Sequence, residues 1–309
     1  WRAAFLSYLR WIMRLMTKIK ALGMLAAVLL LYGCSADGSG RRSGSTVETE
    51  GAVQEDTSGS TYTFVDVEGT EHEAARIEGL PLSGYDYGRL KEEGGFKYYT
   101  DKDGARISRI GIDVSEFQQP VDWSKVSAAG IEFAMVRVGY RGYGSAGTLV
   151  EDKMYRSHMD GALGAGLDVG VYFFSQAVSG EEALEEAQFV LERINEYDIS
   201  YPVVFDTEEI KDDTARTDGL DRSQFTDNCI VFCDRIEEAG YDSMIYANMK
   251  WMAFTLKLEE LEGYDFWYAD YHEEPQCPYA FKMWQYSETG EVPGITGHVD
   301  LDLWFQEEN

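Results

Sequence analysis

The segment 201–209, Tyr-Pro-Val-Val-Phe-Asp-Thr-Glu-Glu, has the pattern of a short apolar β-strand that ends in acidic residues. Side chains at positions i and i+2 of a strand share a face, so Asp206 and Glu208 should project to the same side. Each buried carboxylate is costly to desolvate, so folding alone does not explain two of them at a strand end. Neighbouring acids beside an apolar wall have pKa values that are pushed apart, which allows one of them to donate a proton at neutral pH. The segment therefore predicts a buried strand and an acid–base site.

The alternation of short apolar runs with helix-like segments continues on both sides of this strand. The runs are nearly continuously apolar, as expected for a parallel sheet that is buried on both faces. Ser179 with Glu182 forms a capping box, and Gly240 is placed to end another helix. The predicted strands cover residues 109–114, 132–138, 168–174, 201–206 and 243–246. The predicted helices cover residues 123–129, 151–165, 180–197, 222–239 and 248–262.

The helical pattern stops after residue 263, and three further strand-like runs follow. They cover residues 265–269, 281–286 and 297–301. Five βα units and three strands make eight strands, which is enough to close a barrel of TIM-like size. The predicted fold class is therefore α/β, with a (β/α)5β3 barrel over residues 107–309.

The part of the chain before the barrel has a different composition. Residues 1–33 join a basic stretch to a 13-residue apolar run, which is typical of a secretory signal and short for a membrane-spanning helix. The run ends in a sequence that resembles a bacterial lipobox, so Cys34 is the predicted lipidation site; an uncleaved signal anchor and ordinary secretion are the alternatives. Residues 34–60 are rich in Ser, Gly and acids and predict a flexible linker. Residues 61–106 contain two β-like runs and predict a small β appendage.

The formal net charge of the chain is −28 at pH 7. A nonspecific nucleic-acid binder needs a basic face, so this class of protein is excluded. The negative charge also gives little attraction to anionic polymers, so a lipid tether would be needed to keep the protein near a substrate of that kind. We expect a monomeric extracytoplasmic protein that is anchored to the outer face of the membrane, with a secreted protein as the alternative.

Three cysteines lie in the barrel region. Cys229 and Cys233 are spaced i, i+4 on a predicted helix, a geometry that is poorly suited to a disulfide. A zinc site with His272 and Cys277 is the alternative, but the spacing matches no usual ligand pattern. Buried free thiols are the favoured interpretation, and no metal site is predicted.

Acidic residues recur where the predicted strands end. The reacting groups of such barrels lie at the carboxyl ends of the strands. Asp113 ends the first strand, and Asp300 ends the last one. The first and last strands are neighbours in a closed barrel, so both acids should reach the mouth where Asp206 and Glu208 lie. Asp113 alone could cap a turn and Asp300 alone could be a surface acid, but four acids at three strand ends favour a site.

Aromatic residues occur at comparable positions near the strand ends. A sugar ring packs its C–H faces on aromatic rings while its hydroxyls bond to carboxylates. A single aromatic residue is more often part of the core, but the group as a whole predicts a carbohydrate site. The candidate substrate-binding residues are Tyr172, Phe174, Tyr246, Trp267, Tyr271 and Trp284.

Six short motifs are spread over residues 107–305: GIDVS (111–115), GYRGYG (139–144), GVYFFSQA (170–177), PVVFDTE (202–208), WQY (284–286) and HVD (298–300). Through these motifs the segment resembles glycoside hydrolase family 25, the muramidases. The resemblance implies a flattened eight-stranded barrel that cleaves the β-1,4 bond between N-acetylmuramic acid and N-acetylglucosamine in peptidoglycan. It also implies that no metal or organic cofactor is needed.

The resemblance also implies roles for the four acids. Glu208 corresponds to the general acid that protonates the leaving oxygen, and Asp206 to the second acid of the pair. Asp113 and Asp300 correspond to flanking acids that bind substrate and tune the pair. The residues themselves agree on Glu208, because a glutamate beside charged aspartates has a raised pKa. Two roles stay open for Asp206: a nucleophile, or a group that orients the 2-acetamido group of the substrate.

The sequence thus predicts a lysozyme that acts on the glycan strands of peptidoglycan. One alternative is a barrel that binds wall glycan or scaffolds a complex without cutting, but its expected signature would be a lost acid, and all four are present. Another alternative is a metal-dependent deacetylase. That chemistry needs paired histidine ligands. No such pairing is seen for His72, His158, His272 and His298.

Overall fold

The computed structural model of the chain describes residues 60–211 and 213–306. Thr61–Asn309 form one compact unit. The predicted signal peptide, the predicted lipidation site Cys34 and all but the last residue of the predicted linker lie outside the described residues. Within the described ranges, no helix combines the length and the apolar character that a membrane crossing needs.

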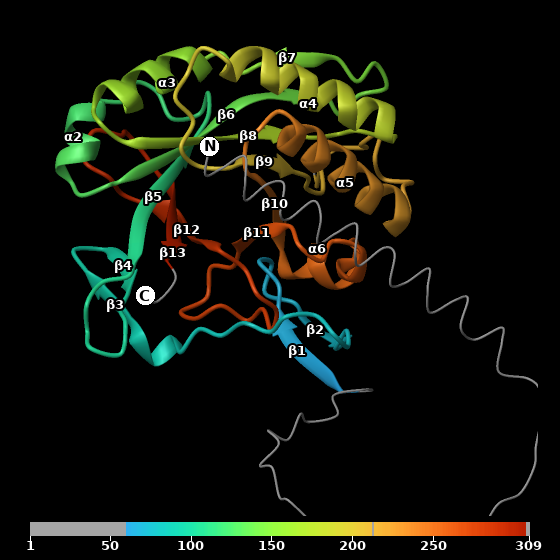
Figure 1. Ribbon diagram of the computed structural model, residues 1–309, viewed down its shortest axis with the longest axis horizontal. Coiled ribbons are helices and arrows are strands. Elements are labelled where there is room, and N and C mark those ends of the chain that lie inside the picture. Colours follow the sequence, from blue (N-terminus) through green and yellow to red (C-terminus); the bar gives the residue numbers. More distant parts are fainter. Residues whose placement is uncertain (1–59, 212, 307–309) are drawn as a thin grey trace, which may run out of the picture. The chain divides into compact units, whose positions relative to one another are not determined.

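Eight of the described strands close into a barrel (Figure 1). They are β5 (Ser108–Val114), β6 (Phe133–Arg141), β8 (Asp168–Phe174), β9 (Val203–Asp206), β10 (Ser243–Asn248), β11 (Asp265–Ala269), β12 (Met283–Gly290) and β13 (Val299–Phe305). Neighbouring strands from β5 to β12 are parallel, whereas β13 pairs antiparallel with both β12 and β5. The predicted α/β barrel of TIM-like type is therefore confirmed. A short strand that was not predicted, β7 (Leu149–Glu151), pairs with β6 beside the barrel.

Helices follow the parallel strands and cover the outside of the barrel (Figure 1). They are α2 (Trp123–Ala128), α3 (Tyr155–Gly164), α4 (Gly180–Ile194), α5 (Arg222–Glu238) and α6 (Met249–Phe254). Local sequence explains where four of them begin, because a side-chain oxygen accepts a hydrogen bond from a first-turn N–H. These N-cap residues are Asp122, Ser179, Asp221 and Asn248. The helix predicted over 248–262 is interrupted: α6 ends at Phe254, and the 3-10 turn η2 (Leu258–Glu260) follows.

Large side chains fill the barrel interior at the amino-terminal ends of the parallel strands, opposite the mouth. The rings of Phe133 and Tyr201 stack with centroids 4.4 Å apart, and Trp304 lies against Tyr201 at 4.9 Å. The close packing explains Gly111, since a Cβ atom there would lie 2.2 Å from the ring of Phe133. Met135 and Met283 belong to the same buried cluster. The interior is therefore a packed core below the mouth rather than a pore.

Two β-hairpins precede the barrel. They are formed by β1 (Thr61–Val65) with β2 (Glu71–Ala75) and by β3 (Leu90–Glu93) with β4 (Phe96–Tyr99). Tyr85, which precedes β3, stacks on Phe305 of β13 at 4.0 Å, and Tyr99 packs on the same ring. Gln276 holds β1 through two hydrogen bonds with the backbone of Val65. These segments thus share contacts with the barrel, and the domain boundaries drawn from the sequence stay a prediction.

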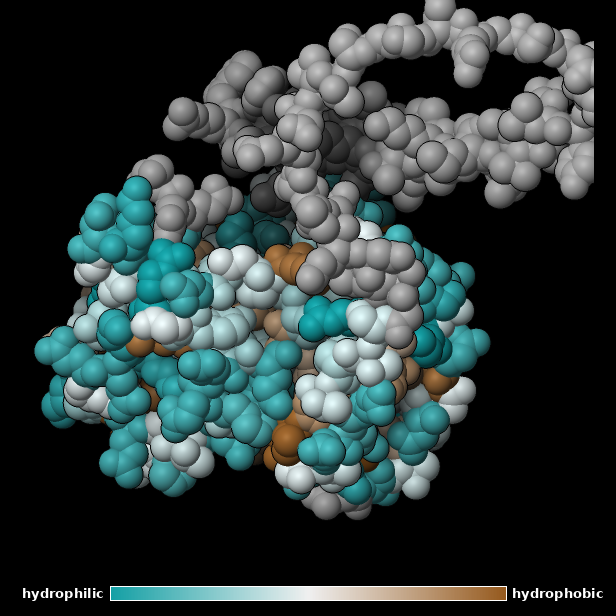
Figure 2. All heavy atoms as spheres, turned by 90° about the horizontal axis from the view of Figure 1, so that it is seen from below, coloured by the Kyte–Doolittle hydropathy of each residue, from teal (hydrophilic) through white to brown (hydrophobic). Residues whose placement is uncertain are grey.

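The surface is mainly polar on the face shown in Figure 2, where hydrophobic residues form small separate groups among the hydrophilic ones. Phe117 is the most exposed of the large hydrophobic residues in the described part of the chain, at 76%. Cys229, Cys233 and Cys277 are buried free thiols, and burial raises the pKa of Cys277 to about 12. No cluster of three or more His, Cys, Asp or Glu side chains suited to a metal ion occurs among the described residues.

Candidate active site

The four predicted acids come from three strands. Asp113 lies near the carboxyl end of β5, Asp206 is the last residue of β9, and Glu208 follows two residues later. The prediction that Asp300 ends the last strand is wrong, because Asp300 is the second residue of β13. Since β13 runs antiparallel to β5, its start lies beside the end of β5, and Asp300 pairs directly with Asp113. The reversed strand thus brings all four acids to the same mouth.

A cavity of about 280 Å³ opens at this mouth. Its size is near the lower end of small-molecule pockets, roughly 300–1,000 Å³. The four acids line it together with five of the six predicted aromatic residues, so carboxylates and aromatic rings meet in one cavity. The aromatic residues are Tyr172, Phe174, Tyr246, Trp267 and Tyr271. The other lining residues are Ser115, Phe117, Gln118, Arg137, Gln285 and Glu288.

Trp284, the sixth predicted aromatic residue, does not line the cavity. Met283 and Gln285 face the barrel interior, so strand alternation turns Trp284 outward. Its ring is fully buried there, its Nε1 donates a hydrogen bond to the carbonyl of Asp270 at 2.7 Å, and Lys97 of β4 lies over the ring. The predicted substrate-binding role of Trp284 is therefore corrected, because the ring is part of the core outside the barrel.

The carboxyl groups of Asp206 and Glu208 share a hydrogen bond in the cavity. Burial, and then the charge of Asp300, raises the pKa of Glu208 to about 7. The charge of Lys211 and the hydrogen bond between the paired carboxyl groups act against this rise. Burial, and then the Glu208 carboxylate, raises the pKa of Asp206 well above its usual value, while the charge of Arg137 acts against it. The pair therefore keeps a proton near neutral pH and can serve as a proton donor.

A second acidic group lies where β5 and β13 pair. Burial, and then the charge of Asp300, raises the pKa of Asp113 well above its usual value. Burial and Glu288 raise the pKa of Asp300 to about 6. Asp302 is fully buried; its Oδ1 accepts a hydrogen bond from Trp267 Nε1 at 2.8 Å, and its Oδ2 has no hydrogen-bond partner in the described part of the chain. Burial raises the pKa of these acids, so protons limit the negative charge of the group at neutral pH.

Gln285 links this acidic group to two aromatic residues. Its Nε2 donates a hydrogen bond to Asp113 Oδ2 at 2.7 Å. Its Oε1 accepts hydrogen bonds from the hydroxyls of Tyr246 and Tyr271, both at 2.9 Å. The amide is buried, so these three contacts fix it in one orientation. One side chain thus orients a carboxylate and two phenols at the cavity wall.

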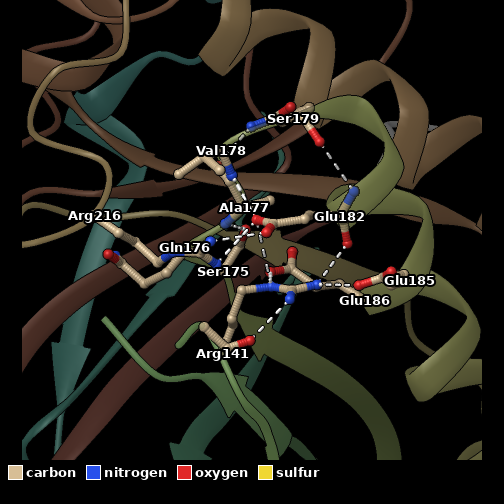
Figure 3. Close-up of polar contacts among 12 residues, drawn as sticks. Arg141, Ser175, Gln176, Ala177, Val178, Ser179, Glu182, Glu185, Glu186 and Arg216 are labelled. Atoms are coloured by element: carbon tan, nitrogen blue, oxygen red, sulfur yellow. Dashed lines mark hydrogen bonds and ion pairs between the residues drawn. The ribbon is translucent and has the colours of Figure 1, made fainter. Parts of the chain in front are cut away.

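The loop after β9 carries Glu208 and is held at several points. Thr217 Oγ1 donates a hydrogen bond to Gln176 Oε1 at 3.0 Å, and Gln176 Nε2 lies 3.5 Å from the carbonyl oxygen of Glu208. Figure 3 shows Arg216 of the same loop beside Glu182 of α4, with which it makes two hydrogen bonds of 2.9 and 2.8 Å. These contacts limit the positions that Glu208 can take.

Arg141 and Glu186 form a buried ion pair next to this loop (Figure 3). Arg141 Nε donates to Glu186 Oε1 at 2.7 Å, and the two remaining nitrogens donate to the carbonyls of Gly147 and Glu182, each at 2.9 Å. Burial raises the pKa of Glu186 to about 7, and hydrogen bonds from Ser175 and Arg141 act against this rise. Neither member of the pair lines the cavity, so this buried charge serves the packing of α4 on β6.

Sequence reasoning missed part of the site. A signal was available for Asp302, since Asp300 and Asp302 have the same i, i+2 spacing as the acids after β9. Alternation along β12 also places Gln285 inward once Trp284 is placed outward. The missed lining residues are Ser115, Phe117, Gln118, Arg137, Gln285 and Glu288, and the buried Asp302 was missed as well.

Known proteins resemble this chain in sequence. The sequence model of the family described as "Glycosyl hydrolases family 25" matches residues 112–295. The autolytic lysozyme of Clostridium acetobutylicum is 26% identical over 193 residues, which are 62% of this chain and 54% of that protein. Lysozyme M1 of Streptomyces globisporus is 28% identical over 202 residues, which are 62% of this chain and 65% of that protein. This chain therefore spans little more than half of the first relative.

A solved structure gives the same result for the fold. The crystal structure of the bacterial lysozyme from Streptomyces coelicolor matches with a TM-score of 0.52 and 26% sequence identity. The match covers 65% of this chain and 93% of that chain. The family model begins within β5 and ends between β12 and β13.

Proposed function

The chain belongs to glycosyl hydrolase family 25, and from this membership we propose that it is a lysozyme-type glycoside hydrolase that degrades peptidoglycan. In the proposed reaction it hydrolyses the β-1,4 bond between N-acetylmuramic acid and N-acetylglucosamine. The names of the two relatives, both lysozymes, support this proposal at the level of the family. A cavity that combines carboxylates with aromatic rings suits a sugar substrate.

Glu208 is the proposed general acid. The observation that carries the proposal is its position beside Asp206 in the cavity, with a pKa raised to about 7 by burial. A carboxyl group that is still protonated near neutral pH can protonate the leaving oxygen as the glycosidic bond breaks. The neighbouring acids then face the positive charge that develops on the sugar ring, which stabilises the transition state.

Asp206 is the proposed second acid of the reaction. It either attacks the anomeric carbon or orients the 2-acetamido group of the substrate for that attack. Both roles need its ionised form, and Arg137 is the lining cation that favours this form. Asp113 and Asp300 flank the pair and are proposed to accept hydrogen bonds from substrate hydroxyls.

The proposal is tested with purified peptidoglycan and the wild-type protein. Mass spectrometry of the released fragments identifies the bond that is cut. We expect fragments with N-acetylmuramic acid at the reducing end. Fragments with N-acetylglucosamine at the reducing end would instead identify a glucosaminidase, and the absence of any released fragment would support a barrel that binds glycan without cutting it.

We also propose that a lipid on Cys34 tethers the enzyme to the outer face of the cell membrane. The support is the basic stretch and apolar run that precede Cys34 in the sequence. The test replaces Cys34 by Ala and follows the protein by cell fractionation. We expect release of the variant into the medium, whereas retention of the variant in the membrane would point to an uncleaved signal anchor.

A further inference from the structure

The inner wall of the cavity presents hydrogen-bond acceptors. Tyr246 and Tyr271 each use their single hydroxyl proton on Gln285, so their oxygens can only accept hydrogen bonds from a ligand. Five of the lining residues are acids, which also accept hydrogen bonds when ionised. This wall therefore suits the hydroxyl donors of a sugar.

Arg137 is the one cation among the residues that line the cavity in the described part of the chain. Its Nε and Nη2 contact Asp152 Oδ2 at 2.8 and 2.7 Å, and Nη2 lies 3.5 Å from Glu116 Oε1. These contacts leave Nη1 without a hydrogen-bond partner among the described residues. Arg137 therefore retains donor capacity for a ligand at an otherwise acidic site.

Phe117 extends this cationic side of the cavity with an apolar surface. The Cζ atom of Arg137 lies 5.3 Å from the centroid of its ring. Although one face of the ring is next to Arg137, the side chain of Phe117 is 76% exposed. An aromatic ring with so much exposed surface at the edge of a ligand cavity is available for contact with an apolar group.

We propose that Arg137 and Phe117 form a subsite for the lactyl ether group of N-acetylmuramic acid. That group carries a methyl, which packs on the ring of Phe117, and a carboxyl oxygen, which accepts hydrogen bonds from Arg137. In peptidoglycan this carboxyl is amide-linked to the peptide stem, and its carbonyl oxygen accepts the same hydrogen bonds from Arg137. The subsite rests on the proposed function and deepens it. The lactyl ether group is the one substituent by which N-acetylmuramic acid differs from N-acetylglucosamine, so a site for this group would distinguish the two sugars.

The test measures binding rather than hydrolysis, because Arg137 also acts on Asp206 and its loss would slow the reaction on any substrate. The full chain with Glu208→Gln is titrated by calorimetry with two probes, N-acetylglucosaminyl-N-acetylmuramic acid and chitobiose. We expect tighter binding of the muramic acid probe. Adding Phe117→Ala or Arg137→Gln should weaken that binding roughly tenfold or more, with less than about a twofold change for chitobiose.

Phe254→Ala is the matched control, since Phe254 is 43% exposed and lies outside the cavity. It should change neither affinity. Arg137→Gln leaves Asp152 buried without its charge partner, so folding is checked by thermal melting, and Phe117→Ala provides an independent test at an exposed position. An equal loss of affinity for both probes, or equal binding of the two probes by the Glu208→Gln protein, would overturn the subsite. Selective binding without any hydrolysis by the wild type would instead contradict the proposed activity alone.

Discussion

Glu208 and Glu186 have the same raised pKa, about 7, in two different settings. Burial is the largest cause for both residues. Glu186 lies outside the cavity and faces Arg141 at 2.7 Å, which holds its carboxylate in place. Glu208 lines the cavity beside Asp206, and the charge of Asp300 raises its pKa further. A raised pKa alone therefore does not identify a catalytic acid; the neighbours decide whether its proton is available to a ligand.

The largest expected effect is on catalysis and separates the two glutamates directly. Glu208→Gln should lower peptidoglycan hydrolysis by roughly 10²–10⁴-fold, because an amide cannot protonate the leaving oxygen. Glu186→Gln should leave hydrolysis per folded molecule nearly unchanged. Both are measured as reducing ends released from purified peptidoglycan. Comparable activity in the two variants would contradict the assignment of Glu208.

The next largest expected effect is on stability and concerns the ion pair of Arg141 with Glu186. Arg141→Met leaves Glu186 buried without its counter-charge, so the free energy of unfolding should fall by about 3–5 kcal/mol. The double variant Arg141→Met/Glu186→Gln removes the uncompensated charge and should lose clearly less. Urea unfolding of the three proteins measures the difference. Equal losses in the single and double variants would show that packing, and not charge, dominates this region.

Both glutamates should also make the protein less stable as pH rises. Their pKa values are raised on folding, so the folded form binds more protons than the unfolded form between the ordinary glutamate pKa and about 7. The melting temperature should therefore fall from about pH 5 to about pH 8, and either Gln variant should flatten this slope by a similar amount. Melting curves across this range test it. An unchanged slope in the Glu186→Gln variant would contradict the raised pKa of Glu186 in the folded protein.

The smallest expected effect concerns the pKa of Glu208, which a nearby cation lowers. Lys211 lowers the pKa of Glu208, and it pairs with Glu68 in the turn between β1 and β2 at 2.8 Å. Lys211→Met should move the alkaline limb of the pH–activity profile to higher pH by less than about one pH unit, because the cation is half-exposed. Lys250→Met, which removes a cation paired with Glu209, is the control and should not move the limb.

The barrel could be predicted because its strands carry a local signal. The apolar run at 168–174 coincides with β8, and the run at 109–114 with all but the first residue of β5. The short strand β7 exists only through pairing with β6, so no local pattern marks it. The break between α6 and η2 was missed for a similar reason, since tertiary contacts override helix propensity over so short a segment.

The site was predictable to the extent that it follows strand ends. Asp113, Asp206 and Glu208 lie there, and strand alternation accounts for their common face. The position of Asp300 depends on the direction of β13, which hydrophobic periodicity does not encode. The contact of Arg137 with Asp152 joins β6 to the segment after β7, and it depends on the pairing of these two strands.

In the described range from β11 to β13, no helix separates the strands, and the two N-terminal hairpins provide packing on that side. Tyr85 and Tyr99 cover Phe305, and Leu82 bridges to the backbone of Tyr279. A recombinant fragment cut to the family match at residues 112–295 would lose this cover and β13 with it. The residues that identify the family are thus fewer than the residues that close the barrel and cover it from solvent. A shortened enzyme should begin before Thr61.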